Sequence, residues 1–261
     1  MNGARASRPV TIAAIDVGTN SIHMVVASVT PNGFTVLATD KEVVRLGEGS
    51  DGMDILTDEA IGRGIKTLQH MKRVAESYDA EMRVVATSAV REAENQGDFV
   101  SAAALLAGID VEVLSGVEEA HLIYLGVSQA LNLGRGTTLV IDVGGGSTEF
   151  CVARRGSLRF AQSVKVGAVR MTDAYLPAGE VTEAGVRRLR SKIRSVISPV
   201  MHDLKKFTFD QVVVSSGTAE TVTRMALLRG GRDMAVSLNG HRFSGAELSS
   251  CLLYTSDAAD D

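Results

Sequence analysis

A short glycine-rich stretch occurs twice in this chain of 261 residues, and this repeat constrains the fold most strongly. The first copy, residues 15–21, reads Ile-Asp-Val-Gly-Thr-Asn-Ser, and the second, residues 141–147, reads Ile-Asp-Val-Gly-Gly-Gly-Ser. Each copy lies between two apolar runs, which predicts a strand, a tight turn and a second strand. Two such copies predict duplicated lobes facing each other across a cleft of phosphate size.

The second copy combines glycines with two carboxylates. Gly144, Gly145 and Gly146 have no Cβ atoms, so their backbone N–H groups can converge on an anion such as phosphate. Asp142 precedes the turn and Glu149 follows it. These carboxylates would repel a phosphate unless a cation lay between them, which predicts Mg²⁺ or another hard divalent ion. The alternative is a glycine-rich hairpin whose aspartate merely caps the turn.

The composition excludes several classes of protein. With 45% hydrophobic and 22% charged residues, the chain can bury one large core or two moderate ones, and the repeat favours two. A net charge of −4 and a sequence pI near 5.8 provide no overall basic field for nucleic acid. The two cysteines, Cys151 and Cys251, fit neither a disulfide framework nor a zinc site. The N-terminal apolar run is too short for a signal peptide or membrane span, so we expect a cytoplasmic protein without nucleic-acid or membrane partners.

The apolar pattern predicts two lobes and a tail. Residues 1–130 form the first lobe in the order β-β-β-α-β-α-β-α, in which Thr57 caps the first helix. Residues 131–250 begin a second lobe with three strands, a short helix, a long helix, a strand and a helix. By comparison with the first lobe, the second lobe lacks one further strand and helix. We therefore expect an incomplete second lobe with a disordered tail at residues 251–261. The alternative is a frayed tail on a complete domain.

Further polar residues are candidates for a site. Glu119, in the first turn of a predicted helix, could act as a general base on water or only interact favourably with the helix dipole. Arg91 could hold phosphate oxygens bidentately or be a solvated surface residue. Gly217 and Thr218 follow a strand, where they could bind an anion or form an ordinary helix cap. His23 is more typical of a structural residue. Three basic residues are weaker candidates for lining a polyanion site: Arg45, Lys165 and Arg170.

Five motifs together resemble the exopolyphosphatase and guanosine pentaphosphate phosphatase (Ppx/GppA) family, within the larger group of actin-like and sugar-kinase-like ATPase folds. The resemblance implies an α/β fold of two duplicated actin-like lobes (ribonuclease H-like, as in sugar kinases, Hsp70 and actin) around a central cleft. It implies the short form of the family, without the helical C-terminal domain, and allows a homodimer. His121 departs from the family pattern, in which arginine is common. The motifs lie at residues 14–21, 86–91, 115–120, 140–149 and 216–218.

The resemblance implies a Mg²⁺-dependent hydrolase that releases terminal orthophosphate processively from inorganic polyphosphate. Glu119 would be the general base, Asp142 and Glu149 would hold the metal or orient water, and Arg91 would bind phosphate. The alternatives are pppGpp as the substrate, an actin-like ATP-dependent kinase, and a sensor that binds polyphosphate or alarmone without turnover. The phosphate-binding residues would belong to three turns: Gly18, Thr19, Asn20, Ser21, Gly144, Gly145, Gly146, Ser147, Gly217 and Thr218.

Overall fold

The computed structural model describes residues 9–48, 53–176, 181–229, 238–247 and 249. The chain divides into two compact units, residues 1–115 (unit 1) and residues 116–261 (unit 2). Each unit contains one mixed sheet that carries one copy of the glycine-rich repeat. The α/β class and the duplication predicted from the sequence are confirmed. The predicted tail at 251–261 lies outside the described residues.

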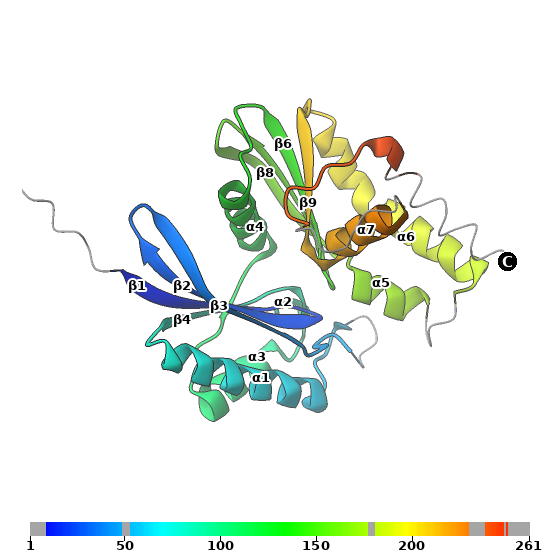
Figure 1. Cartoon of the computed structure of the whole chain (residues 1–261). Helices are drawn as coiled ribbons and strands as arrows, with labels where there is room; N and C mark the ends of the chain where they lie inside the picture. The colour runs from blue at the N-terminus through cyan, green and yellow to red at the C-terminus, as the bar shows by residue number, and fades with distance from the viewer. Residues whose placement is uncertain (1–8, 49–52, 177–180, 230–237, 248, 250–261) are drawn as a thin grey trace, which may run out of the picture. The chain divides into compact units, whose positions relative to one another are not determined.

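Unit 1 is built on a five-stranded sheet with the strand order β3-β2-β1-β4-β5 (Figure 1). Strands β1, β2 and β3 pair in antiparallel fashion, and β4 and β5 extend the sheet in parallel on the other side of β1. The first copy of the repeat forms the turn between β1 and β2. The strands are β1 (Val10–Val17), β2 (Ser21–Thr30), β3 (Gly33–Val43), β4 (Glu81–Ala86) and β5 (Glu112–Val113).

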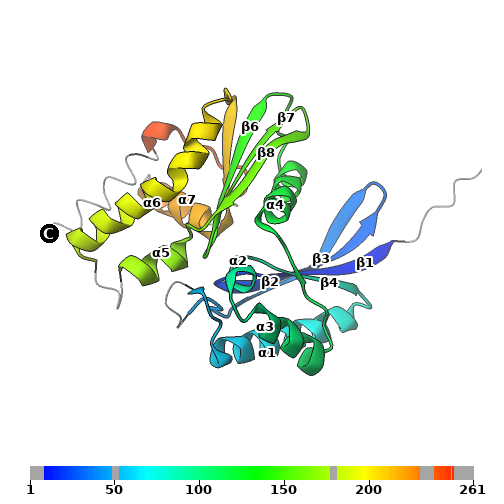
Figure 2. The same cartoon turned by 180° about the vertical axis from the view of Figure 1, so that it is seen from behind.

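Helices cover one face of this sheet (Figure 2). The longest of them begins after Thr57, whose hydroxyl accepts a hydrogen bond from the Ala60 N–H at 3.2 Å, as the sequence predicts. Its residues Ile65, Leu68 and Met71 recur at helical spacing and are buried in the core. The helices are α1 (Asp58–Ser77), α2 (Ser88–Glu92), α3 (Gln96–Ala102) and a π-helical turn (Ala103–Ala107).

Unit 2 repeats the same arrangement with four strands in the order β8-β7-β6-β9. Strands β6, β7 and β8 are antiparallel neighbours, and β9 is parallel to β6, as β4 is to β1 in unit 1. The second copy of the repeat forms the turn between β6 and β7. The strands are β6 (Thr137–Val143), β7 (Thr148–Arg154), β8 (Ser157–Val164) and β9 (Gln211–Ser215).

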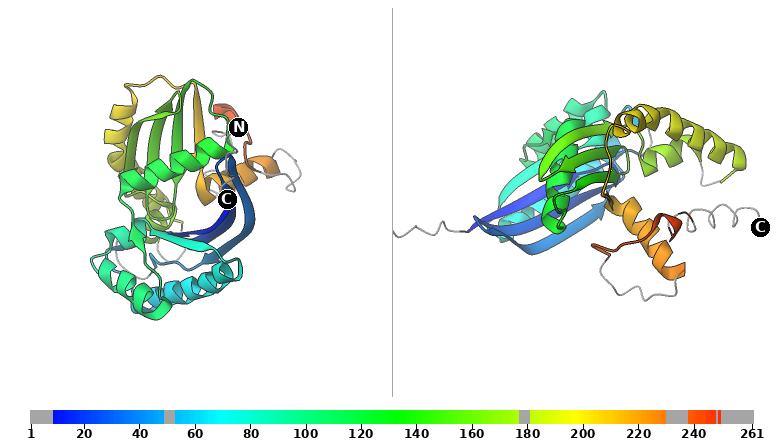
Figure 3. Two further views of the ribbon diagram at one scale, coloured as in Figure 1. Left: turned by 90° about the vertical axis from the view of Figure 1, so that its left-hand side faces the viewer. Right: turned by 90° about the horizontal axis from the view of Figure 1, so that it is seen from above.

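Both faces of the unit 2 sheet are covered, as the green and yellow helices in Figure 3 show. Side chains alternate between the faces along each strand, so Leu139 and Val152 belong to the core under α6, whereas Val140 and Cys151 belong to a second cluster under α4. The helices are α4 (Gly116–Ala130), α5 (Ala168–Tyr175), α6 (Glu183–Leu204) and α7 (Ser216–Arg229). Within the described ranges, no helix is both long and apolar enough to cross a membrane.

Helix α4 packs on the sheet of the second unit. The sequence pattern assigns this helix to the end of the first lobe, residues 1–130, whereas the division between the two units falls before Gly116. Ala120 and Tyr124 are buried against Val140 and Cys151, and the helix contacts β7 and β8. Residues of α4 therefore lie beside the second copy of the repeat.

Candidate active site

The two copies of the glycine-rich repeat fold into the same turn. In each copy the first glycine donates its N–H to the carbonyl oxygen of the serine, from Gly144 to Ser147 at 3.0 Å and from Gly18 to Ser21 at 3.1 Å. A Cβ atom on Gly144 would approach that oxygen to 3.3 Å, and one on Gly18 to 2.9 Å. Glycine is favoured at both positions because the backbone passes so close to itself.

The start of helix α5 holds one side of the turn in unit 2. The carbonyl oxygen of Gly144 accepts a hydrogen bond from the Ala168 N–H at 2.9 Å, and that of Gly145 accepts one from the Arg170 N–H at 3.0 Å. The Arg170 side chain, only 7% exposed, adds a third bond from Nε to the carbonyl oxygen of Gly146 at 2.8 Å. Three consecutive carbonyl groups are thereby fixed on the α5 side.

The N–H groups of the same peptide units point the opposite way. In a trans peptide the carbonyl and the following N–H are antiparallel, and the chain contains no cis peptide bond among its described residues. The N–H groups of Gly145, Gly146 and Ser147 are therefore directed away from α5. In the part of the chain that the structure describes, the N–H groups of Gly145 and Gly146 meet no acceptor. Consecutive N–H groups on one side of a glycine turn are suited to binding an anion.

Close packing of α5 on the turn depends on Gly167. A Cβ atom at this position would lie 2.3 Å from the carbonyl oxygen of Gly145 and 2.5 Å from the carbonyl carbon of Gly146. These neighbours are backbone atoms, so they cannot rotate away as a flexible side chain would. Any side chain at this position would therefore push the turn away from α5.

A row of four polar residues crosses the sheet of unit 2 beside the turn. Ser163 on β8 lies opposite Glu149 on β7, which lies opposite Asp142 on β6, which in turn lies beside Ser215 on β9. Residues in register on neighbouring strands point to the same face of a sheet. This is the face covered by α4, because Cys151, two residues beyond Glu149 on β7, packs in the α4 cluster.

Serine hydroxyls orient both carboxylates in this row. The Ser163 hydroxyl donates to Oε1 of Glu149 at 2.7 Å, and the Ser215 hydroxyl donates to Oδ2 of Asp142 at 2.5 Å. Burial raises the pKa of Asp142, and the hydrogen bond from Ser215 opposes this shift. The two side chains are thus held in place from the two edge strands.

Glu149 is a buried carboxyl group with carboxylate neighbours. Its burial and the nearby charge of Glu119 raise its pKa to about 7, with a smaller contribution from Asp142. Hydrogen bonds from the hydroxyls of Ser147 and Ser163 act in the other direction. Glu149 is only 1% exposed, so water cannot solvate its negative charge. The carboxyl group is therefore either protonated or paired with a cation.

Helix α4 begins over this row. A Cβ atom on Gly116 would lie 2.6 Å from the Cβ atom of Ser163, so the first turn of the helix is in close contact with β8. Glu119 lies in that turn, is partly exposed, and is near enough for its charge to raise the pKa of Glu149. Unit 2 therefore brings together the predicted general base and both predicted metal ligands.

The third predicted turn is the junction between β9 and α7. Ser216, the first residue of α7, has a φ angle of 79°, and its hydroxyl donates to the carbonyl oxygen of Val143 at 2.5 Å. Gly217 and Thr218 follow within the first turn of the helix. The backbone N–H groups in the first turn of a helix have no partner within it, so this end can attract an anion.

The corresponding turn of unit 1 is held by the segment after β3. The carbonyl oxygen of Thr19 accepts a hydrogen bond from the Gly47 N–H at 3.2 Å. That of Asn20 accepts bonds from the N–H groups of Val44 at 3.0 Å and Arg45 at 2.8 Å. As in unit 2, the carbonyl groups are fixed on one side of the turn.

Two other predicted residues lie in unit 1. Nη1 of Arg91 donates to the carbonyl oxygen of Leu114 at 3.1 Å, and its side chain is 18% exposed, so this arginine is anchored in the fold. His23 lies opposite Asp16 in the sheet, and its Nε2 atom is 2.8 Å from the hydroxyl oxygen of Ser21. Arg91 and the first turn thus belong to unit 1, and the carboxylates to unit 2.

The sequence was compared with models of protein families. Residues 25–252 match the model of the Ppx/GppA phosphatase family. The chain belongs to the Ppx/GppA family. The match includes residues of both units and confirms the resemblance indicated by the five motifs.

Individual Ppx/GppA relatives agree with this assignment. A Haemophilus influenzae protein with the provisional name exopolyphosphatase is 34% identical over 215 residues, which are 82% of this chain and 66% of that protein. The chain thus spans just under two thirds of the length of this relative. A crystal structure of an exopolyphosphatase from Cytophaga hutchinsonii has a TM-score of 0.80 at 27% identity, covering 87% of this chain and 73% of that one. The crystal structure of an exopolyphosphatase-like protein has a TM-score of 0.84 at 30% identity, covering 94% and 77%.

The fold is the predicted actin-like ATPase fold, with one mixed sheet in each unit. A type IV pilus biogenesis complex, PilM–PilN, shares it at a TM-score of 0.50 and 16% identity, a likeness of fold alone. The fold therefore does not by itself specify the chemistry of a Ppx/GppA member, and the site must be argued from its own residues.

The carboxylate pair Asp142 and Glu149 in the candidate site fits a hard divalent cation. Oδ1 of Asp142 receives no hydrogen bond from the described residues, and a cation would offset the burial and the carboxylate repulsion that raise the pKa of Glu149. The pair is not a complete three-ligand site, because the described side chains that place three ligand atoms within 4.8 Å of one another lie elsewhere. This incompleteness suits Mg²⁺, which proteins hold through one or two carboxylates together with water and substrate phosphates.

Two residues of the candidate site, Gly167 and Ser163, are not identified by the sequence pattern, and Ser215 is predicted only as part of the junction that could present N–H groups and a hydroxyl to an anion. Gly167 and Arg170 fix the glycine turn, and Ser163 and Ser215 orient the carboxylates. Arg170 is predicted only as a weaker candidate for lining a polyanion site, whereas its side chain is buried against the turn. Counting residues from the β7–β8 turn would pair Glu149 with Gln162, because the register shifts between Val152 and Ala153, so the count does not find Ser163. No local signal marks Gly167 either, since its role depends on a contact between distant segments.

Proposed function

We propose that this protein is an exopolyphosphatase that hydrolyses the terminal phosphoanhydride bond of inorganic polyphosphate and releases orthophosphate processively. The observation that carries the proposal is the pairing, within unit 2, of an N–H cradle at Gly145 and Gly146 with the carboxylates Glu119, Asp142 and Glu149. The cradle suits an anion, whereas the carboxylates suit a cation and a water molecule. Membership of the Ppx/GppA family and the names of its exopolyphosphatase relatives support the same chemistry.

The glycine turn would bind the terminal phosphoryl group. Its N–H groups are held in place by the bonds to Ala168 and Arg170 before any ligand arrives, so they need no reorganisation as charge develops on the phosphoryl oxygens. The junction at Gly217 and Thr218, also in unit 2, would bind further phosphate oxygens, and the turn of unit 1 and Arg91 stay predicted phosphate-binding groups. Such prearranged donors are the main protein contribution to phosphoryl transfer.

Glu119 would take a proton from the attacking water. It is partly exposed, in contrast to the buried Glu149, so water can reach its carboxylate. After burial, the negative charge of Glu119 is the next cause that raises the pKa of Glu149. An ionised carboxylate at Glu119 is the form that can accept a proton during the reaction. General-base assistance of this kind contributes about 10²–10⁴-fold to the rate.

Asp142 and Glu149 would hold the divalent cation. Bound there, Mg²⁺ would neutralise charge on the phosphoryl oxygens. The serine bonds to both carboxylates would keep their remaining oxygens turned toward the cation. Glu149 would then remain ionised at neutral pH, although burial alone disfavours its charge.

A phosphate-release assay tests the proposal. Purified protein is incubated with polyphosphate, with pppGpp or with ATP, each with Mg²⁺ and with EDTA. We expect release from polyphosphate that needs Mg²⁺ and no added nucleotide. Release from pppGpp but not from polyphosphate would identify pppGpp as the substrate. Phosphorylation of an acceptor by ATP would favour a kinase. Binding of polyphosphate without any release would favour a sensor.

We also propose that the protein is a cytoplasmic homodimer that does not bind nucleic acid or membranes. Polyphosphate and pppGpp end in the same phosphoanhydride, so the groups around the terminal phosphate do not discriminate between them. Light scattering of the purified protein would measure the oligomeric state.

A further inference from the structure

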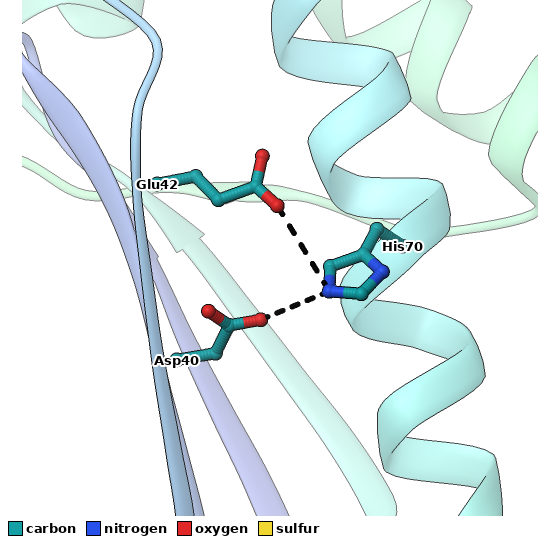
Figure 4. Close-up of side chains that lie close together, drawn as sticks. All are labelled: Asp40, Glu42 and His70. Atoms are coloured by element: carbon teal, nitrogen blue, oxygen red, sulfur yellow. Dashed lines mark hydrogen bonds and ion pairs between the residues drawn. The ribbon is translucent and has the colours of Figure 1, made fainter.

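A second group of metal-ligating side chains lies in unit 1, away from the residues used above. Asp40 and Glu42 project from β3 toward His70 on α1 (Figure 4). The Nε2 atom of His70 is 3.1 Å from Oδ2 of Asp40 and 3.9 Å from Oε1 of Glu42. One ligand atom from each residue lies within 4.8 Å of the other two.

The fold itself brings the three side chains together. Asp40 and Glu42 are two residues apart on a strand, so they point to the same face, the one on which Ala38 packs against the α1 core. His70 is on the helix that covers this face. The Thr67 hydroxyl, one helical turn before His70, donates to Oε2 of Glu42 at 2.8 Å and leaves Oε1 turned toward the imidazole.

Hydrogen bonds alone do not explain why both carboxylates lie beside the Nε2 atom of His70. A neutral imidazole has at most one proton on Nε2, which can be donated to Asp40 at 3.1 Å, whereas Glu42 at 3.9 Å is too far for a hydrogen bond. Two carboxylates nevertheless converge on this single nitrogen. A metal ion among the three groups would accept an electron pair from each and would offset the repulsion between the carboxylates.

We propose that Asp40, Glu42 and His70 form a binding site for a transition-metal cation such as Zn²⁺, which links β3 to α1. Imidazole together with carboxylate is a donor set suited to Zn²⁺, whereas Mg²⁺ favours oxygen alone. Tetrahedral Zn²⁺ with bonds of about 2.0–2.1 Å places neighbouring ligand atoms roughly 3.3 Å apart. The distance between Asp40 and His70 is already near this value. The 3.9 Å between Glu42 and His70 would shorten by about half an ångström on binding, which the partly exposed side chain of Glu42 permits.

The proposal is independent of the hydrolase activity. The cation would hold the edge strand β3 against the helix that covers the sheet, and so it would stabilise unit 1. Its open coordination positions would be filled by water, because His70 and Glu42 are 44% and 42% exposed at their side chains. The magnesium site proposed at Asp142 and Glu149 belongs to the other unit.

The test is calorimetric titration of ZnCl₂ into tag-free full-length protein that has been treated with EDTA and desalted. We expect saturable binding with one strong site per chain and a higher Tm in the presence of Zn²⁺. H70N and D40N should each weaken this binding by at least about tenfold, because each removes one of three ligands. Circular dichroism would verify that both variants are folded.

Two control variants separate this site from other metal binding. H202N removes an exposed histidine of α6 and should leave the strong site unchanged. D142N alters the proposed magnesium site and should also leave it unchanged, even if phosphate release is lost. Absence of saturable Zn²⁺ binding in the unmodified protein, or equal binding by H70N and the unmodified protein, would overturn the proposal.

Discussion

The Nε atom of Arg170 donates to the carbonyl oxygen of Gly146 at 2.8 Å, and this bond fixes the last peptide unit of the glycine turn. R170Q leaves that buried carbonyl without its donor and loosens the turn. We expect phosphate release to fall about 100-fold, since displacement of a positioning group by roughly an ångström has effects of this size. Steady-state kinetics with polyphosphate would measure kcat and KM separately.

The matched control for Arg170 is R188Q. Arg188 is an exposed residue of α6, and its replacement should leave the kinetics unchanged. R170K retains the positive charge but not the geometry of the guanidinium, so it should be nearly as impaired as R170Q. Full activity of R170Q would show that α5 holds the turn through its backbone bonds alone.

The close packing of Gly167 against the glycine turn leads to a second prediction. G167A places a Cβ atom 2.3 Å from the carbonyl oxygen of Gly145, so the turn must move away from α5. We expect loss of polyphosphate binding and a lower Tm, measured by calorimetry. G126A, at an exposed position of α4 with no atom near the added Cβ, should be neutral or stabilising. Equal behaviour of the two variants would contradict the packing argument.

Glu119 is the predicted general base. E119Q removes the proton acceptor without changing the shape of the side chain, so kcat should fall about 10²–10⁴-fold while polyphosphate binding persists. The matched control is E118Q, which alters the neighbouring carboxylate and should retain most turnover. Phosphate release by E119Q at the rate of the unmodified protein would remove Glu119 from this role.

The lowered pKa of His23 should make the stability of the protein depend on pH. Burial, and then the charge of Lys41, lowers the pKa of His23 below its ordinary value of 6.5. The unfolded chain therefore binds the proton more readily, so stability contributed by neutral His23 is present above about pH 6.5 and is lost as pH falls below it. Urea unfolding across this range should show a smaller loss for H23Q than for the unmodified protein. H202Q should keep the full loss, and an H23Q variant that also kept it would count against this assignment.

Much of this structure follows from local sequence patterns. The repeat specifies two equivalent hairpins, and register counted from their turns places Asp142 opposite Glu149. The cap at Thr57 and the apolar spacing of α1 are equally local signals. In each case the residues that determine the element are its immediate neighbours in the chain.

The residues that the sequence pattern does not reveal depend on contacts between distant segments. Arg170 and Gly167 act on a turn more than twenty residues earlier in the chain. Helix α4 has an apolar side that could cover either sheet, and only its contacts with β7 and β8 assign it to unit 2. The convergence of His70 with Asp40 and Glu42 likewise joins a helix to a strand about thirty residues away.

The two hairpins form the same turn, but the residue opposite the aspartate of the repeat is Glu149 in unit 2 and His23 in unit 1. The two copies therefore share the turn, while the charge beside it differs. The unit 2 copy carries two carboxylates, and the unit 1 copy carries Asp16 opposite an imidazole that is flanked by Lys41. An exchange of these two side chains would place a glutamate opposite Asp16 in unit 1 and would leave Asp142 opposite an imidazole in unit 2.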